Sequence, residues 1–216
     1  MSGVQMSNVS ESTHGVHRLV LVRHGETVGQ SSIRYYGATD VGLSDSGRRQ
    51  MERVRDALAG ESFDAVFTSA LQRTVAAARI VVPALTPQPL AGFNEINFGR
   101  WEGLTRDEIA ACDPRLFQQW RATLHEFTYP EGDAVPAFRA RGVAALRAWL
   151  PAAPARPLLI VHKGIIATIV AELLRLSRGE RAAWPIDLAS IHVVAAAGGA
   201  WHAERVNQTD HLDGLQ

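Results

Sequence analysis

The chain has very little cysteine, no long apolar run and no recognisable export signal. Cys112 is the only cysteine in the 216 residues, so no disulfide can form within the chain. This cysteine usage fits a reducing compartment. No apolar stretch is long enough to cross a bilayer, and residues 1–16 lack the basic and apolar regions of a secretory signal. We therefore expect a cytoplasmic protein without a membrane partner.

The chain also lacks net charge. Lysine plus arginine number 22, as do aspartate plus glutamate, so the formal net charge is zero. No overall field then attracts nucleic acid, and we expect no nucleic-acid partner. Any affinity for anions has to come from a local cluster of basic side chains. Hydrophobic residues make up 46% of the sequence, which is enough to bury a core without metals or crosslinks.

The apolar pattern predicts alternating strands and helices. Short apolar runs are typical of buried strands, and between them apolar residues recur at the spacing of a helix. We expect strands at 18–22, 65–68 and 157–161, helices at about 44–60, 71–82, 135–149 and 164–176, and a hairpin at 191–206. We expect Ser69 and Asp113 to cap the helices that follow them. The predicted fold class is α/β, a three-layer α/β/α sandwich with a mostly parallel central sheet. Residues 1–16 are predicted to be a disordered leader, and 17–216 one domain with a small helical lid insertion at about 100–136.

Basic and imidazole side chains follow the predicted strand ends. Arg23 and His24 follow the first strand, His162 and Lys163 follow the last, and Arg73 comes soon after the strand at 65–68. In parallel sheets, ligands bind outside the carboxyl ends of the strands. A neutral imidazole is nucleophilic near pH 7, and guanidinium groups bind phosphate. These residues alone leave two interpretations open, an anion site and ordinary structural roles.

Residues 21–27, which read LVRHGET, resemble the signature of the histidine phosphatase superfamily, in its phosphoglycerate mutase-like branch. Further segments resemble the family in the same order, and they lie at 36–40, 43–47, 69–74, 95–103, 161–164 and 207–212. The likeness covers nearly everything from Arg18 onward.

The resemblance implies a role for each matching residue. His24 becomes phosphorylated, Glu95 protonates the leaving oxygen and then deprotonates the attacking water, and His162 donates a hydrogen bond to the phosphoryl group. The implied phosphate-binding residues are Arg23, Arg73, Gly25, Thr27 and Gln30. No cofactor and no metal are expected. A zinc site built from His24, His162 and Glu95 is the alternative, which the flanking arginine charge disfavours.

The sequence departs from the family pattern at two positions. Gln30 stands where the family usually has asparagine, and Lys163 stands inside a block that normally reads His-Gly-Gly. Our hypothesis is that Lys163 contacts a second anionic group of the substrate, such as a carboxylate; the alternative is that it points to solvent. Trp101 and Tyr36 are the other candidate substrate-selecting residues.

The predicted function is that of a metal-independent phosphomonoesterase, which hydrolyses a small phosphorylated metabolite through a phosphohistidine. The alternatives are a cofactor-dependent phosphoglycerate mutase and a non-catalytic module that binds a phosphorylated ligand. The segment 103–161 is short compared with that of the mutases, so water reaches the phosphoenzyme more readily, which favours hydrolysis. The sequence leaves a homodimer open.

Overall fold

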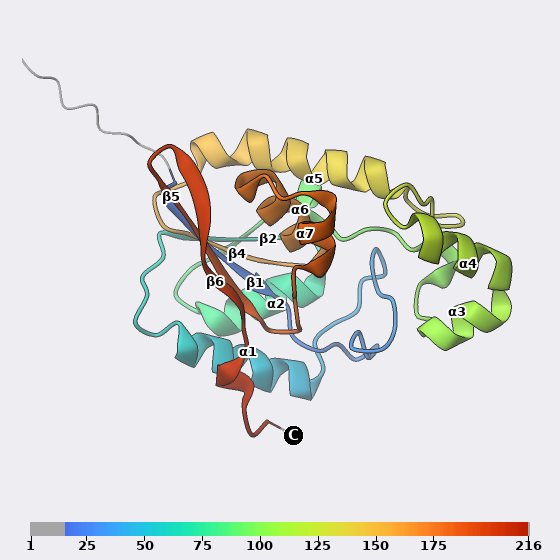
Figure 1. Cartoon of the computed structure of the whole chain (residues 1–216). Helices are drawn as coiled ribbons and strands as arrows, with labels where there is room; N and C mark the ends of the chain where they lie inside the picture. Colours follow the sequence, from blue (N-terminus) through green and yellow to red (C-terminus); the bar gives the residue numbers. More distant parts are fainter. Residues whose placement is uncertain (1–15, 216) are drawn as a thin grey trace, which may run out of the picture.

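The computed structural model describes residues 16–215, and within that range six strands form a single sheet (Figure 1). The strand order is β3-β2-β4-β1-β5-β6. Apart from Val16, the expected leader lies outside the described residues. The strands are β1 (Arg18–Arg23), β2 (Ala65–Thr68), β3 (Pro87–Pro89), β4 (Pro157–Val161), β5 (Ile191–Ala197) and β6 (Ala200–Gln208).

The sheet is mostly parallel, as predicted. Strands β3, β2, β4 and β1 run parallel to one another, whereas β5 is antiparallel to both β1 and β6. In the register between β1 and β4, Arg23 pairs with Val161. The next residues, His24 and His162, therefore leave the sheet as neighbours at its carboxyl edge.

Helices cover both faces of the sheet. They are α1 (Asp45–Ala57), α2 (Gln72–Val81), α3 (Arg106–Cys112), α4 (Pro114–Thr123), α5 (Val135–Trp149), α6 (Lys163–Leu174) and α7 (Arg178–Ala183). Side chains alternate along β1, so Val20 and Val22 join the core under α1 and α2, and Leu19 and Leu21 join the core under α5 and α6. The two cores confirm the predicted three-layer sandwich (Figure 1).

Helices α3 and α4 lie to one side of the sheet rather than over either face (Figure 1). An aromatic cluster joins them to the segments on either side. The ring of Trp101 stacks on Phe127 with centroids 5.4 Å apart and meets Tyr129 edge-on at 5.7 Å. These rings belong to the same apolar core as the buried side chains of α5 and α6, and the assignment of segment 100–136 as a lid insertion stays a prediction.

One expected helix cap is wrong, and the other is correct in position but makes no side-chain capping bond. Helix α2 is preceded by Leu71 and has no side-chain cap, because the hydroxyl of Ser69 is used elsewhere in the site described below. Asp113 does precede α4, but its carboxylate accepts hydrogen bonds from the side chains of Arg100 and Trp101 instead of from the helix. In both cases a tertiary contact replaces the local one.

Candidate active site

His24 is the first residue after β1, and only 4% of it is exposed. Its Nδ1 lies 2.8 Å from the carbonyl oxygen of Gly25. A carbonyl can only accept, so Nδ1 carries the proton and Nε2 keeps its lone pair. Burial lowers the pKa of His24 well below its usual value, and the charges of Arg73 and Arg23 lower it further. The imidazole is therefore neutral at pH 7, with an unprotonated nitrogen suited to nucleophilic attack.

Two buried guanidinium groups flank this imidazole. Arg73 is fully buried and donates from Nη1 to the carbonyl of Thr39 at 3.0 Å and from Nη2 to that of Gly37 at 2.7 Å. Arg23 donates from Nη1 to the carbonyl of Ile186 at 3.0 Å. Within the described residues, the Nε atoms of both arginines are buried without a hydrogen-bond partner. Buried, unpaired donors on fixed cations are suited to binding an oxyanion.

His162 follows β4 and faces His24, with ring centroids 5.1 Å apart at an interplanar angle of 69°. Its Nε2 lies 2.8 Å from the hydroxyl oxygen of Ser69, and its Nδ1 is buried without a partner among the described residues. Burial lowers the pKa of His162 well below its usual value, and the charge of Arg73 lowers it further. Nδ1 of His162 is therefore a third unpaired nitrogen of the site, beside the Nε atoms of Arg23 and Arg73.

Glu95 supplies the carboxyl group of the site. Its Oε1 accepts from the backbone N–H of Ile96 at 3.0 Å, and its Oε2 from that of Gly164 at 2.9 Å. Burial raises the pKa of Glu95, although these hydrogen bonds and the charges of Arg73 and Arg23 oppose the shift. A carboxyl group with a raised pKa holds its proton at higher pH than an exposed one, which suits a general acid.

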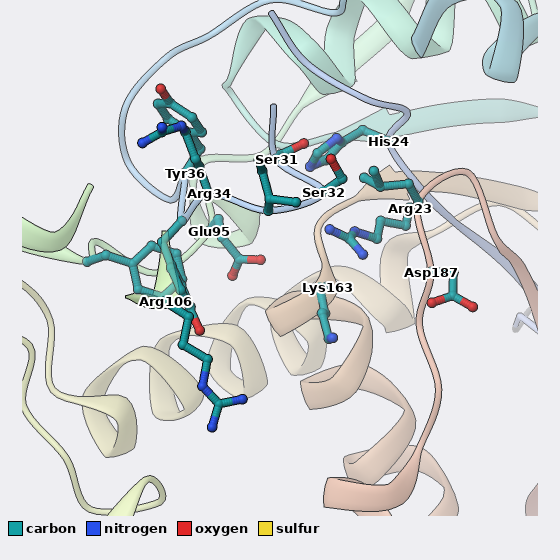
Figure 2. Close-up of a pocket in the computed structure, with 14 residues that line it drawn as sticks. Arg23, His24, Ser31, Ser32, Arg34, Tyr36, Glu95, Arg106, Lys163 and Asp187 are labelled. Carbon is teal, nitrogen blue, oxygen red and sulfur yellow. The ribbon is translucent and has the colours of Figure 1, made fainter. Parts of the chain in front are cut away.

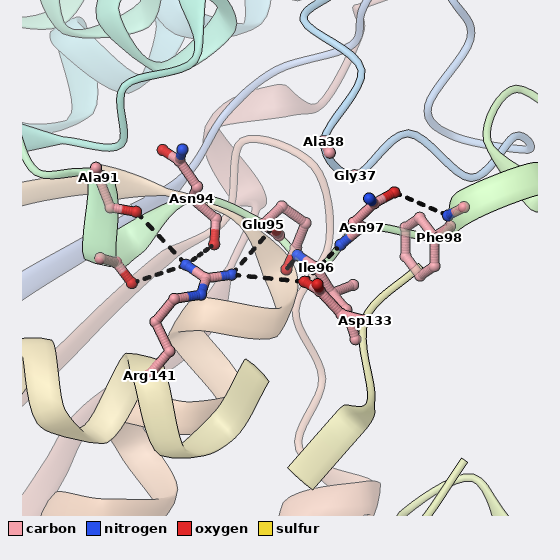
Figure 3. Close-up of polar contacts among 12 residues, drawn as sticks. Gly37, Ala38, Ala91, Asn94, Glu95, Ile96, Asn97, Phe98, Asp133 and Arg141 are labelled. Atoms are coloured by element: carbon pink, nitrogen blue, oxygen red, sulfur yellow. Dashed lines mark hydrogen bonds and ion pairs between the residues drawn. The ribbon is translucent and has the colours of Figure 1, made fainter. Parts of the chain in front are cut away.

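The loop that carries Glu95 is fixed from α5. The guanidinium of Arg141 donates to the backbone carbonyls of Gly92, Asn94 and Glu95 at 3.0, 2.9 and 3.3 Å (Figure 3). Asp133 lies 3.9 Å from the same guanidinium and accepts from the N–H of Asn97 at 3.0 Å. Arg141 thus holds the end of the short 3-10 helix Ala91–Phe93 and the irregular residues 94 and 95 that follow it.

An open cavity of about 540 Å³ borders this group of side chains, although Arg73 and His162 are not among the residues that line it (Figure 2). Of the predicted site residues, Arg23, His24, Tyr36, Glu95 and Lys163 line it. The other lining residues are Ser31, Ser32, Ile33, Arg34, Tyr35, Phe98, Arg106, Asp187 and Leu188, none of which the sequence singled out. The cavity is therefore rich in cations, and Arg106 also rests on the ring of Phe117 at 5.7 Å.

Lys163 is the first residue of α6, and its side chain is exposed toward the cavity between Glu95 and Asp187 (Figure 2). Partial burial lowers its pKa, and the charge of Arg23 lowers it further, whereas Asp187 and Glu95 raise it. An ammonium group at this position is available to a substrate.

Trp101 does not line the cavity. Only 1% of it is exposed, and its indole N–H donates to the carboxylate of Asp113 at 2.7 Å. A buried ring in the core of the insertion cannot touch a substrate directly. Its proposed role in substrate selection is therefore not supported by its position.

Gly25, Thr27 and Gln30 shape the loop after β1. A Cβ on Gly25 would lie 2.5 Å from the carbonyl oxygen of Gly47, so glycine is needed there for contact with α1. Thr27 is buried, and its hydroxyl accepts from the N–H of Ser31 at 3.3 Å. Gln30 has a positive φ of 62°. None of the three lines the cavity, so their binding of phosphate stays a prediction.

Two general features of the described residues bear on function. Within residues 16–215, no group of three or more His, Cys, Asp or Glu side chains is arranged to hold a metal ion. No helix in the same range has both the length and the apolar character that spanning a bilayer demands.

The model of the histidine phosphatase superfamily (branch 1) matches residues 19–209. An acid phosphatase of Mycobacterium tuberculosis is 29% identical over 199 residues, which cover 90% of this chain and 94% of the relative. The structure of a mycobacterial glucosyl-3-phosphoglycerate phosphatase superimposes with a TM-score of 0.75 at 28% identity, over 89% of this chain and 99% of that one. The α-ribazole phosphatase of Shigella flexneri has the same fold, with a TM-score of 0.79 at 23% identity over 88% and 96% of the two chains.

Proposed function

This chain belongs to the histidine phosphatase superfamily, and we propose that the site around His24 hydrolyses phosphomonoesters of small metabolites through a phosphohistidine. One observation carries the proposal. A neutral His24 with a free Nε2 lies among buried cationic and imidazole groups, of which Arg23, Arg73 and His162 each have an unpaired ring or guanidinium nitrogen. This combination supplies both a nucleophile and stabilisation for a phosphoryl group.

In the first half-reaction, Nε2 of His24 attacks phosphorus. The P–N bond forms while the ester P–O bond breaks, and the bonding electrons leave with the alcohol oxygen. The carboxyl group of Glu95 gives that oxygen its proton. Arg23, Arg73 and His162 stabilise the charge on the three phosphoryl oxygens.

In the second half-reaction, the carboxylate of Glu95 takes a proton from water. The water oxygen attacks phosphorus, the P–N bond breaks, and its electrons return to Nε2 of His24. Inorganic phosphate leaves, and the site regains a neutral histidine and a protonated glutamate. One carboxyl group serves both steps, since activating water is the reverse of protonating an alcohol. The fixed charge of two arginines takes the place of a divalent cation, so the proposed reaction is metal-independent.

Two cavity residues, Lys163 and Tyr36, are proposed to select the substrate. Two of the relatives named above are, by name, a glucosyl-3-phosphoglycerate phosphatase and an α-ribazole phosphatase, and a small phosphorylated metabolite fits the size of the cavity. Lys163 contacts a second anionic group of that substrate. The substitution Lys163→Gly is expected to lower kcat/KM about tenfold for a phosphate ester whose alcohol part carries a carboxylate. It should leave kcat/KM unchanged for an ester whose alcohol part is uncharged. Equal effects on both esters would refute the contact.

The activity is tested with a panel of phosphorylated metabolites in buffer that contains a metal chelator. We expect release of inorganic phosphate from at least one small ester in the absence of added metal. Adding a bisphosphoglycerate primer and following isomerisation of phosphoglycerate separates a mutase from a phosphatase. Isomerisation faster than phosphate release would overturn the phosphatase assignment. We place the enzyme in the cytoplasm, in keeping with its single cysteine.

A further inference from the structure

A second cluster of positive charge surrounds His125, away from the residues that line the catalytic cavity. His125 lies in the loop between α4 and α5, Arg139 lies on α5, and Arg178 and Arg181 lie on α7. The Nη2 atoms of Arg139 and Arg181 lie 3.0 and 3.1 Å from the same ring nitrogen, Nδ1 of His125. Two helices, α5 and α7, thus bring arginines to one imidazole.

This arrangement leaves the guanidinium donors poorly matched. A guanidinium can only donate, so Nδ1 of His125 is the acceptor and the ring proton is on Nε2. That nitrogen has one lone pair, which the two arginines share. In the part of the chain that the structure describes, the only other acceptor for Arg139 is the backbone carbonyl of His125, at 3.5 Å from Nη1. Apart from that carbonyl, the forked donors of the two arginines have no oxygen acceptor among residues 16–215.

Carboxylates do not neutralise the cluster. Within the described part of the chain, no ion pair joins Arg139, Arg178 or Arg181 to an acidic side chain. Partial burial, followed by the charges of Arg181 and Arg178, lowers the pKa of Arg139 to about 10. Burial and the three arginine charges lower the pKa of His125, and Glu126 is the acidic residue that acts against them. Like charges have been brought together here without an internal counterion.

We propose that Arg139 and Arg181, with His125 between them, form a binding site for a small oxyanion, such as a phosphate or carboxylate group. Planar guanidinium forks bind such groups through two parallel hydrogen bonds, which one imidazole nitrogen cannot accept. An anion in this site stabilises the charge of all three arginines, and Arg178 adds its field from the exposed side of α7.

Two kinds of ligand present the same oxyanion chemistry to this site. The oxyanion is either a free anion or a second acidic group on a substrate that extends out of the catalytic cavity. The chain leads from α7 through residues 184–186 to Asp187, which lines that cavity.

The site is tested by titrating the full-length protein with inorganic phosphate while the ring resonances of His125 are followed by NMR. Sodium chloride at matched ionic strength is the control for screening. His125 is not among the residues that line the catalytic cavity, and following its ring does not require phosphatase activity. We expect a saturable shift with phosphate and none with chloride.

Three variants make the test specific. Arg139→Gln and Arg181→Gln each remove one fork, and each is expected to weaken phosphate binding at His125 about tenfold. Arg121→Gln removes an exposed arginine from α4 of the same insertion and is expected to leave binding unchanged. Unfolding midpoints identify a variant that has lost its fold, and the two replacements on different helices serve as independent tests.

Kinetics then separate the two sources. If the anion belongs to the substrate, Arg139→Gln raises KM for a phosphate ester with a second acidic group and not for p-nitrophenyl phosphate. If the anion is free, binding at His125 is weakened while KM changes for neither ester. The proposal is overturned if the His125 resonances do not move with phosphate, or if they move equally in all three variants.

Discussion

The hydroxyl oxygen of Ser69 lies 2.8 Å from Nε2 of His162, and this contact orients the second histidine of the site. When the hydroxyl donates to Nε2, the ring proton sits on Nδ1, the atom that has no partner among the described residues. Nδ1–H is then a donor for a phosphoryl oxygen. Ser69 is held in turn by the N–H of Leu71 at 3.1 Å and the hydroxyl of Thr74 at 2.8 Å.

Ser69→Ala is expected to lower kcat/KM about tenfold, because His162 loses the hydrogen bond that sets its tautomer and orientation. Steady-state kinetics with a phosphate ester measure the effect. Ser190→Ala is the matched control, because Ser190 is also buried and lies 3.0 Å from Nε2 of His192, a histidine of β5 outside the site. A loss of activity no larger than that of Ser190→Ala would show that Ser69 is merely structural.

Arg141→Ala is expected to impair the acid step selectively. Without this guanidinium the turn that carries Glu95 is no longer fixed, and protonation of the leaving oxygen suffers. An alkyl alcohol needs that proton and p-nitrophenol does not, so kcat/KM should fall about tenfold further for the alkyl ester.

Two controls accompany Arg141→Ala. One is a variant of a second arginine on the same helix, and the other is added guanidinium ion, which replaces the missing side-chain group. Arg147→Ala removes an exposed arginine that pairs with Glu172 and should leave both esters unaffected. Added guanidinium ion should partly restore alkyl-ester turnover by Arg141→Ala. A loss that is equal for both esters and insensitive to guanidinium would contradict a positioning role.

Gly164→Ala is expected to displace the acid directly. A Cβ at this position would overlap with Oε1 of Glu95 and lie 2.9 Å from the ring of Phe138. We expect at least a tenfold loss of kcat/KM for alkyl esters together with a lower unfolding midpoint. Gly179→Ala on α7 is the control: a Cβ there meets nothing within 4 Å, and alanine in a helix should stabilise the protein by about 0.5 kcal/mol. Similar activities of the two variants would refute the steric argument.

The pH dependence of kcat/KM follows from two opposite pKa shifts. The nucleophile must be unprotonated, and burial with two arginine charges lowers the pKa of His24, so the acidic limb should lie below the usual histidine range. The acid must be protonated, and burial raises the pKa of Glu95, so the basic limb should lie above the usual carboxyl range. The profile for an alkyl ester should thus be highest in weakly acidic buffer, and Glu95→Gln should remove the basic limb. Activity that only rises through pH 6.5 would contradict these assignments.

Much of this site could be predicted because it depends on local patterns and one topological rule. The short apolar runs before His24 and His162 indicated strands, and parallel strands bring their carboxyl ends to one edge. The register of β1 and β4 makes the two histidines neighbours, although they are more than a hundred residues apart in sequence. The resemblance of residues 95–103 to the family then pointed to Glu95.

The rest depends on tertiary contacts that leave no local pattern. A serine before a helix is usually a cap, so the link from Ser69 to His162 could not be read from spacing. Nothing in the periodicity of α5 distinguishes Arg141 from its other arginines. Asp187 reaches the cavity because β5 runs antiparallel to β1 and so begins at the catalytic edge. Strand β3 and helix α7 were missed because three and six residues are too few for a periodic signal.

The central claim is that Nε2 of His24 takes the phosphoryl group. Rapid quenching of the enzyme with a phosphate ester, followed by digestion and mass spectrometry, tests it most directly. We predict one acid-labile, base-stable phosphate on His24, and no such adduct in His24→Ala, whose kcat should fall by at least about a thousandfold. Phosphate on another residue, or turnover by His24→Ala close to that of the wild type, would contradict the account.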